Sequence, residues 1–203
     1  MLMTILKILL YIPAWLLFPT VFKGKRNIPK KNAILVCNHR SNIDCIVLAL
    51  STCRNQKYLA KKELFKNKCF GGFLKGLGCI PIDRQKTDLN AIKLSLKVLK
   101  QGKLLTIFPE GTRNKAEGDT QDDLQQVKAG ACMLAIKSKS PIVPVWIKKK
   151  SRPFCLNTLR FGKAFTLEEF YDKKLDKETL DLAAAKLQEK MMENKIENKK
   201  RKK

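Results

Sequence analysis

Short apolar runs rich in β-branched residues alternate with helical patterns along most of this chain, and the alternation limits its fold class. Parallel strands are joined by long crossovers, usually helices, so the pattern predicts a parallel sheet covered by helices. Strands are expected at residues 33–37, 58–60, 79–82, 104–108 and 142–147, with a further candidate at 159–165. Helices are expected at residues 44–51, 88–100, 124–139 and 177–196. We therefore predict one α/β domain with a mostly parallel central sheet flanked by helices.

Two of these elements carry signals of their position or ends. The run "CIPI" contains Pro81, which has no N–H to give to a sheet, so this strand is expected near an edge or a bulge. Residues 88–100 repeat apolar side chains with a helical period. Asp88 is expected to cap the start of this helix and Gly102 to stop it.

The first 22 residues are apolar and carry one charge, Lys7. As a helix they would reach ~33 Å, about the thickness of a bilayer core, but Pro13 and Pro19 interrupt them. Such a segment either spans the bilayer or enters one leaflet. The alternative, a buried core helix, fits less well because the segment is apolar all round rather than striped.

A run of lysines and arginines with no acidic residue follows at residues 23–31. Basic flanks stay in the cytoplasm, which places the rest of the chain at the cytoplasmic face of the cell membrane. We predict a membrane-associating helical segment at residues 1–22, a folded domain at 23–196 and a disordered basic tail at 197–203.

The chain carries 42 Lys and Arg against 18 Asp and Glu, a net charge of +24. This surplus attracts nucleic acid, an anionic membrane or a phosphorylated substrate, and charge alone does not choose among them. Few aromatics and the lack of a nucleic-acid motif argue against the first. Seven cysteines without C-x-x-C indicate free thiols in a reducing compartment, and no metal site is expected.

The stretch "NHRSNID" at residues 38–44 holds the only histidine, His39, two residues past an expected strand end. On one regular helix His39 and Asp44 would point ~140° apart and could not pair. They can meet if His39 lies on the turn before the helix, with Ser41 as N-cap and Asp44 at the third helical position. The alternative is a helix-start carboxylate beside an ordinary polar loop residue.

If the pair is functional, a neutral imidazole can take a proton from a hydroxyl while the carboxylate fixes its tautomer. The hydroxyl can belong to the substrate, which allows direct acyl or phosphoryl transfer to an alcohol. Two other expected strand ends carry arginines suited to phosphate, Arg84 in "CIPIDR" and Arg113 in "FPEGTRN". In the second loop Gly111 permits a sharp turn, and Glu110 can orient the arginine or accept from a substrate hydroxyl.

The blocks "NHRSNID", "CIPIDR", "FPEGTRN" and "IVPVWI", in this order, resemble the four motifs of the glycerolipid acyltransferase superfamily. Within it the chain is most similar to 1-acyl-sn-glycerol-3-phosphate acyltransferases, over roughly residues 20–165. The resemblance implies that His39 is the general base and Asp44 its partner. It implies a thioester oxyanion stabiliser at Lys61, or as the alternative Lys62. It implies substrate-binding roles for Arg84, Glu110, Gly111, Thr112, Arg113 and Pro144.

The same resemblance implies transfer of a fatty acyl group from a thioester to the sn-2 hydroxyl of lysophosphatidate, with no cofactor. The donor is a thioester of acyl carrier protein or of coenzyme A, and the motifs do not choose between them. Glycerol-3-phosphate or another lysophospholipid remains an alternative acceptor. A non-catalytic, membrane-bound basic binding module is an alternative of a different class. The segment "KNKCFGG" departs from the family pattern, which usually has a proline before the glycine.

Overall fold

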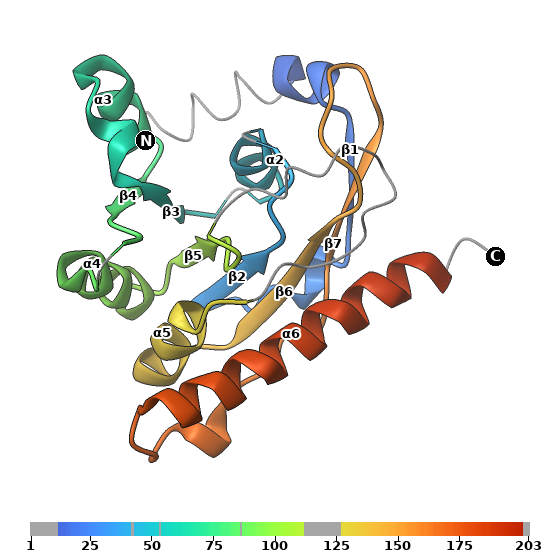
Figure 1. The fold of residues 1–203 in the computed structure, drawn as a ribbon. Coiled ribbons are helices and arrows are strands. Elements are labelled where there is room, and N and C mark those ends of the chain that lie inside the picture. The colour runs from blue at the N-terminus through green and yellow to red at the C-terminus, as the bar shows by residue number, and fades with distance from the viewer. Residues whose placement is uncertain (1–11, 42, 53, 86, 112–126, 201–203) are drawn as a thin grey trace.

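The computed structural model describes residues 12–41, 43–52, 54–85, 87–111 and 127–200. Its centre is a seven-stranded sheet with the strand order β1-β7-β6-β2-β5-β3-β4 (Figure 1). All neighbouring strands are parallel except β6 and β7, which confirms the predicted fold class. The strands are β1 (Thr20–Lys23), β2 (Ala33–Cys37), β3 (Gln56–Lys61), β4 (Cys79–Ile82), β5 (Leu104–Ile107), β6 (Ile142–Ile147) and β7 (Asn157–Phe161).

Helices cover both faces of the sheet. One face packs against α2, and the other packs against α4, α5 and α6. The helices are α2 (Asp44–Leu50), α3 (Lys68–Gly76), α4 (Leu89–Lys100), α5 (Gly130–Ser138) and α6 (Lys177–Lys200). Three short 3₁₀ turns, η1 (Lys25–Asn27), η2 (Lys62–Phe65) and η3 (Glu168–Phe170), complete the named elements.

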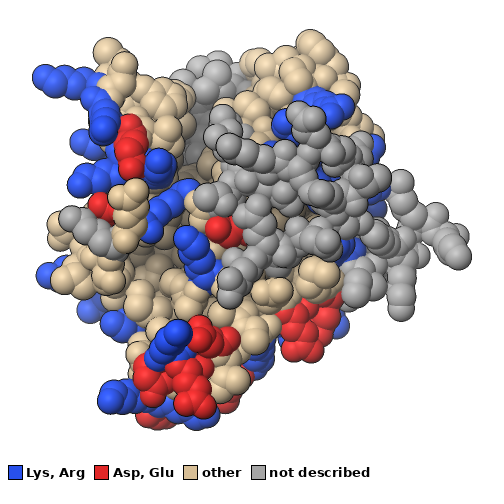
Figure 2. All heavy atoms as spheres, in the orientation of Figure 1, with Lys and Arg blue, Asp and Glu red and all other residues tan. Residues whose placement is uncertain are grey.

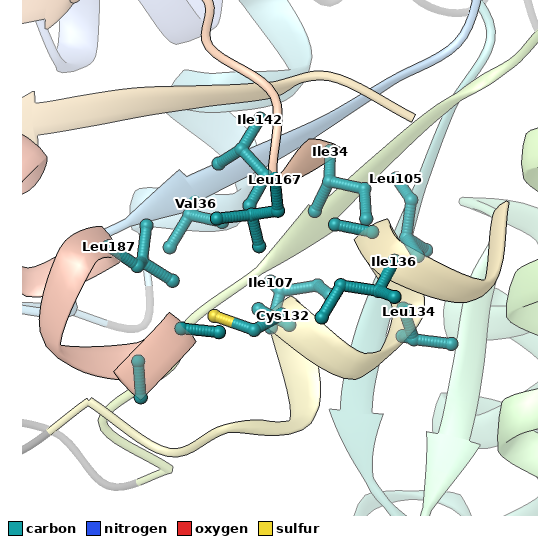
Figure 3. Packing of buried hydrophobic residues seen from close by; sticks show 14 of the residues in the cluster. Ile34, Val36, Leu105, Ile107, Cys132, Leu134, Ile136, Ile142, Leu167 and Leu187 are labelled. Atoms are coloured by element: carbon teal, nitrogen blue, oxygen red, sulfur yellow. The ribbon is translucent and has the colours of Figure 1, made fainter. Parts of the chain in front are cut away.

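Strand β2 lies in the middle of the sheet and is buried on both faces. Ile34 and Val36 pack toward α5 and α6, as Figure 3 shows, whereas Leu35 and Cys37 pack toward α2. A strand buried on both faces needs apolar residues at every position, which explains the unbroken run "AILVC". Since β2 is fixed from both sides, the loop that follows it starts from a rigid point.

Several elements match the sequence predictions closely. Strands β2, β4 and β6 have the predicted ends, and β4, with Pro81, is an edge strand. Helix α4 begins after Asp88, whose side chain accepts a hydrogen bond from the Ala91 N–H at 3.0 Å. Gly102 follows this helix with a φ of +72°, a conformation that glycine adopts without strain.

The helix predicted at residues 124–139 is shorter than expected. Its first three positions lie outside the described residues, and the observed helix α5 begins only at Gly130. The Lys128 N–H donates to the Pro109 carbonyl at 3.0 Å, which ties this segment to the loop after β5. This long-range hydrogen bond takes the place of a helical one at Lys128. The sequence pattern therefore predicted a longer helix than the one observed.

The two ends of the chain also differ from expectation. Strand β1 was not predicted, and its first residues lie in the segment predicted to associate with the membrane. Residues 12–17 before it are helical, and residues 1–11 lie outside the described residues. At the other end, α6 extends to Lys200, so residues 197–200 are helical rather than disordered. Lys and Glu favour helix, and a packed helix propagates into such a sequence.

No helix among the described residues is long and apolar enough to cross a membrane.

Helix α6 offers a direct test of the core. Leu187 is fully buried against the sheet, whereas Leu182 on the same helix is 57 % exposed. We expect Leu187→Ala to lower the free energy of unfolding by about 3 kcal/mol, because it leaves a cavity between α6 and the sheet. Leu182→Ala, the matched control, should change it by less than about 0.5 kcal/mol. Urea denaturation measures both, and equal losses would contradict this packing.

Candidate active site

The C-terminal ends of four neighbouring parallel strands, β2, β5, β3 and β4, lie at the same end of the sheet. Parallel sheets present their functional groups beyond the C-terminal ends of their strands. The predicted residues follow these strand ends: His39 follows β2, Glu110 follows β5 and Arg84 follows β4. Lys61 is the last residue of β3.

Asn38 fixes the start of the loop after β2, a role that the sequence did not suggest. Its buried side-chain amide accepts from the Ile147 N–H at 2.7 Å and donates to the Ile147 carbonyl at 3.1 Å. These two bonds clamp the loop to the end of β6. Because the loop is held there, the position of the His39 backbone beyond the end of β2 is fixed.

His39 and Asp44 form the predicted pair. Nδ1 of His39 lies 3.0 Å from Oδ2 of Asp44, and the carboxylate is fully buried. The same oxygen accepts from the backbone N–H groups of Arg40 and Ser41, each at 2.7 Å. Three donors thus converge on one buried carboxylate oxygen. Asp44 therefore fixes both the ring and the turn that leads into α2.

The start of α2 differs in detail from the prediction. Asp44 is the first residue of the helix rather than its third, and Ile43 occupies the N-cap position without a side-chain cap. Ser41 Oγ accepts a long bond, 3.4 Å, from the Ile43 N–H. The carboxylate reaches back to the turn as a capping box does. This bond from the Asp44 carboxylate to the turn brings His39 and Asp44 together, although Ser41 does not act as the N-cap.

Phe108 stacks on the ring of His39, with centroids 4.2 Å apart and planes at 28°. Phe108 belongs to the "FPEGTRN" block, yet no role was predicted for it. With Nδ1 held by Asp44, Nε2 is the ring nitrogen that remains for a reactant, and the His39 side chain is 12 % exposed. The imidazole is thus fixed on its face and on one edge while solvent still reaches it.

Glu110 holds the backbone of the histidine. Its Oε1 accepts from the His39 N–H at 3.2 Å, while Oε2 is buried and has no hydrogen-bond partner among the described residues. Burial raises the pKa of Glu110 to about 7, although the His39 N–H bond and the charge of Arg40 favour the anion. The predicted contact with Arg113 lies outside the described residues. The unpartnered Oε2 suits the predicted bond to a substrate hydroxyl.

Arg84 joins two of the motif loops. Its guanidinium donates to the carbonyl of Gly111, which links "CIPIDR" to "FPEGTRN". Gly111 has a φ of +72°, and a Cβ there would lie 3.0 Å from Nζ of Lys128. The turn therefore requires glycine, as predicted. Thr112, like Arg113, lies outside the described residues.

The other two predicted residues are placed differently. Lys61 is exposed at the site edge, and its Nζ lies 3.7 Å from the carboxylate of Glu63. Pro144 is buried in mid-strand, where it pairs with Val36. Its carbonyl accepts from Asn194 Nδ2 of α6 at 3.0 Å, so it lies under α6 and not at the strand ends. No group of three metal-ligating side chains occurs in the described ranges.

A pocket of about 550 Å³ opens beside the joined loops. Arg84, Gly111 and Phe108 line one side of it. The rest of the lining comes from α4, α5 and the strand ends, and is mainly apolar: Leu59, Ile82, Ile92, Ile107, Met133 and Leu134. The arrangement combines a histidine paired with a carboxylate, a fixed cation and a mainly apolar pocket, which suits a substrate with both a charged and a hydrocarbon part.

Comparison with known proteins connects this geometry to a family. The sequence profile of the acyltransferase family matches residues 20–148. The 1-acyl-sn-glycerol-3-phosphate acyltransferase of Bacillus subtilis is 38 % identical over 123 residues, which cover 60 % of this chain and 58 % of that protein. The enzyme of that name from Streptococcus pneumoniae is 38 % identical over 117 residues, 57 % of this chain and 41 % of its own length. The chain thus spans about half the length of these relatives.

A solved structure has the same fold. The crystal structure of the 1-acyl-sn-glycerophosphate acyltransferase from Thermotoga maritima superposes with a TM-score of 0.61 at 24 % identity. The match covers 92 % of this chain and 75 % of that chain.

The pKa of Glu110 predicts how stability depends on pH. Between its ordinary pKa of 4.5 and the folded value of about 7, the folded chain holds a proton that the unfolded chain has released. The free energy of unfolding therefore falls as pH rises through this window. Glu110→Gln removes that titration. From pH 4.5 to pH 7 we expect the free energy of unfolding of the wild type to fall by about 2 kcal/mol relative to that of the variant. Urea denaturation at constant ionic strength measures both. A difference that does not vary with pH would contradict the assignment.

Proposed function

We propose that this chain, which belongs to the acyltransferase family, transfers a fatty acyl group from a thioester to the sn-2 hydroxyl of 1-acyl-sn-glycerol-3-phosphate (lysophosphatidate), giving phosphatidate. The observation that carries the proposal is the His39–Asp44 pair, held at 3.0 Å at the end of the central strand. The names of the two relatives above support the choice of acceptor.

The chemistry follows from the fixed tautomer. With its Nδ1–H directed to Asp44, the ring presents the lone pair of Nε2 to the lipid hydroxyl. Nε2 takes the hydroxyl proton as the oxygen attacks the thioester carbonyl. The C–S bond then breaks, and the leaving thiolate takes the proton back from the imidazolium. The nucleophile is the lipid itself, so the mechanism needs no acyl-enzyme.

The other predicted residues fit the charges of this reaction. In this proposal Arg84, Gly111, Thr112 and Arg113 hold the acceptor phosphate, and Glu110 Oε2 accepts from an acceptor hydroxyl. Lys61 is the proposed donor to the thioester oxyanion and would have to leave Glu63 to reach it. For Pro144, under α6, a role on the acyl or donor side stays a prediction.

An acceptor panel tests the proposed reaction. Purified protein is offered lysophosphatidate, glycerol-3-phosphate or another lysophospholipid, each with an acyl thioester. We expect turnover of lysophosphatidate, and a fall of about 10³-fold in kcat for His39→Ala, because the general base is lost. The thermal midpoint of the variant shows whether it is still folded. Activity on glycerol-3-phosphate alone would reject the acceptor, and an active His39→Ala variant would reject the mechanism.

We also propose that the protein works at the cytoplasmic face of the cell membrane, bound to anionic lipid. Trp15 and Leu16, in the helical residues 12–17, are exposed apolar side chains, and the basic run at residues 23–31 follows them. Apolar groups at the interface together with adjacent cations are what an anionic bilayer retains. Both the acceptor and the product of the proposed reaction are anionic lipids.

Salt distinguishes the two contributions to membrane binding. Raising salt from about 0.05 M to about 0.5 M should weaken binding to anionic liposomes roughly tenfold, because it screens the charges. Turnover of detergent-dispersed lysophosphatidate should persist under the same conditions. Co-sedimentation with liposomes measures the binding. Binding that does not depend on salt would leave the apolar residues as the sole anchor.

A further inference from the structure

The loop between β6 and β7, residues 148–156, lies beyond the same end of the sheet as His39, because β6 is parallel to β2. Its sequence, "KKKSRPFCL", holds four cations and no acid. Two of its apolar side chains are turned toward the solvent, since Phe154 is 78 % exposed and Leu156 is 64 % exposed. Neither belongs to the core, and the proposed reaction does not use them.

The backbone of Phe154 shows that this side chain is not placed there by local preference. Its φ is +58°, in the left-handed region that bulky side chains rarely adopt. Glycine or asparagine would take this conformation at a lower cost. A large aromatic side chain that is both strained and exposed gains little from folding, so its position points to a contact outside the chain.

The loop is joined to the helical residues 12–17. The Phe154 N–H donates to the Leu17 carbonyl at 2.7 Å, and the Asn157 N–H, just after the loop, donates to the Pro19 carbonyl at 2.9 Å. Figure 1 shows the two segments side by side where β1 begins. Together they carry a set of exposed apolar side chains, which we call the apolar corner: Ile12, Trp15, Leu16, Phe154 and Leu156.

Cations lie next to the apolar corner. Lys149, Lys150 and Arg152 are exposed on the same loop. In the part of the chain that the structure describes, none of these three forms an ion pair with a carboxylate. Figure 2 shows this part of the surface as mostly uncharged, with Lys and Arg side chains beside it. The loop therefore presents apolar groups and a positive potential together.

This combination fits an anionic bilayer better than a protein partner. Apolar side chains enter the boundary between headgroups and acyl chains, while adjacent Lys and Arg side chains reach the lipid phosphates. A second copy of this chain would bring the same cations to the contact, and the two copies would repel each other. The apolar corner also continues from residues 12–17, for which membrane binding is already proposed.

The loop begins directly after a contact of the active site. Ile147, the last residue of β6, exchanges two hydrogen bonds with the side chain of Asn38, the residue before His39. A surface that holds the loop therefore also holds the end of β6 and, through Asn38, the start of the histidine loop. The position of His39 relative to that surface follows from this connection.

We propose that the β6–β7 loop is a second bilayer contact of this protein. Phe154 and Leu156 enter the membrane interface beside residues 12–17, and the loop cations bind anionic headgroups around them. The inference rests on the proposed function and deepens it, since it assigns this loop to the proposed membrane binding. Two contacts at one end of the sheet turn the strand ends that carry His39 toward the bilayer, which supplies the acceptor.

Removing the two exposed side chains tests the contact. The full chain with Phe154→Gly and Leu156→Ser is compared with Leu182→Ser, which removes an exposed leucine from α6. Glycine suits the backbone at this position, so the loop variant should keep its thermal midpoint. With vesicles of phosphatidylcholine and phosphatidylglycerol, we expect the apparent Kd from co-sedimentation to rise roughly tenfold or more in the loop variant. The Leu182→Ser control should bind as wild type does.

Turnover separates the membrane contact from catalysis. With lysophosphatidate dispersed in detergent, kcat of the loop variant should stay within about twofold of wild type, because the loop does not touch the reactants. With lysophosphatidate embedded in the same vesicles, the rate at limiting vesicle concentration should fall roughly tenfold, in parallel with binding. The Leu182→Ser control should match wild type in both assays.

A fluorophore on the exposed Cys155 reports the depth of the loop directly. An environment-sensitive label is attached to this thiol in a chain with Cys53→Ser and Cys69→Ser. We expect its emission to shift to the blue when vesicles are added, and to be quenched by spin labels on the lipid chains. The same label on Leu182→Cys, in a chain that also carries Cys155→Ser, should show neither effect.

Vesicle binding that is equal in the loop variant and wild type would overturn the proposal. A Cys155 label that does not respond to vesicles would also overturn it, as would one already shifted to the blue without them, because the chain itself would then cover the loop. A dimer that depends on Phe154, seen by light scattering without lipid, would show a protein partner instead. Vesicle binding that depends on the loop, in a wild-type chain without turnover of lysophosphatidate in detergent, would keep the contact and reject the proposed acyl transfer.

Discussion

The buried carboxylate of Asp44 is the interaction on which the site depends. Three donors surround its Oδ2: the ring of His39 and the backbone N–H groups of Arg40 and Ser41. The same bonds also close the turn from β2 into α2. The orientation of the imidazole is therefore a consequence of folding the turn and does not wait for a substrate.

Two carboxylates, those of Asp44 and Glu110, lie beside His39, and their surroundings differ. Asp44 Oδ2 accepts from three donors, whereas Glu110 Oε1 accepts from one. The second oxygen of each carboxylate is buried and has no hydrogen-bond partner among the described residues. Burial raises the pKa of Glu110 to about 7, and the neighbouring Asp44 adds a smaller contribution in the same direction. Asp44 holds the ring of His39 in place. Glu110, with its raised pKa, is suited to exchange a proton or a hydrogen bond near neutral pH.

The sequence predicted what depends on local pattern. The unbroken apolar run of β2 and the spacing of His39 and Asp44 sufficed to place the pair at a strand–helix turn. The Phe108 stacking, the Asn38 clamp on Ile147 and the bond from His39 to Glu110 could not be predicted, because each joins strands whose order only the tertiary fold sets. Strand β1 was missed because three of its four residues lie at the end of the apolar segment at residues 1–22, where they show no separate strand pattern.

The order of strands explains how two unlike reactants can reach one histidine. Strand β2 is the middle strand, with β1 at one edge of the sheet and β4 at the other. Because β1 runs opposite to β2, the helical residues 12–17 that lead into it lie at the same end of the sheet as His39. An acceptor drawn from the bilayer would arrive on the β1 side. The pocket beside Arg84 is lined from β3, β4, β5, α4 and α5. A donor held in it would therefore approach from the β4 side of the sheet, opposite to β1.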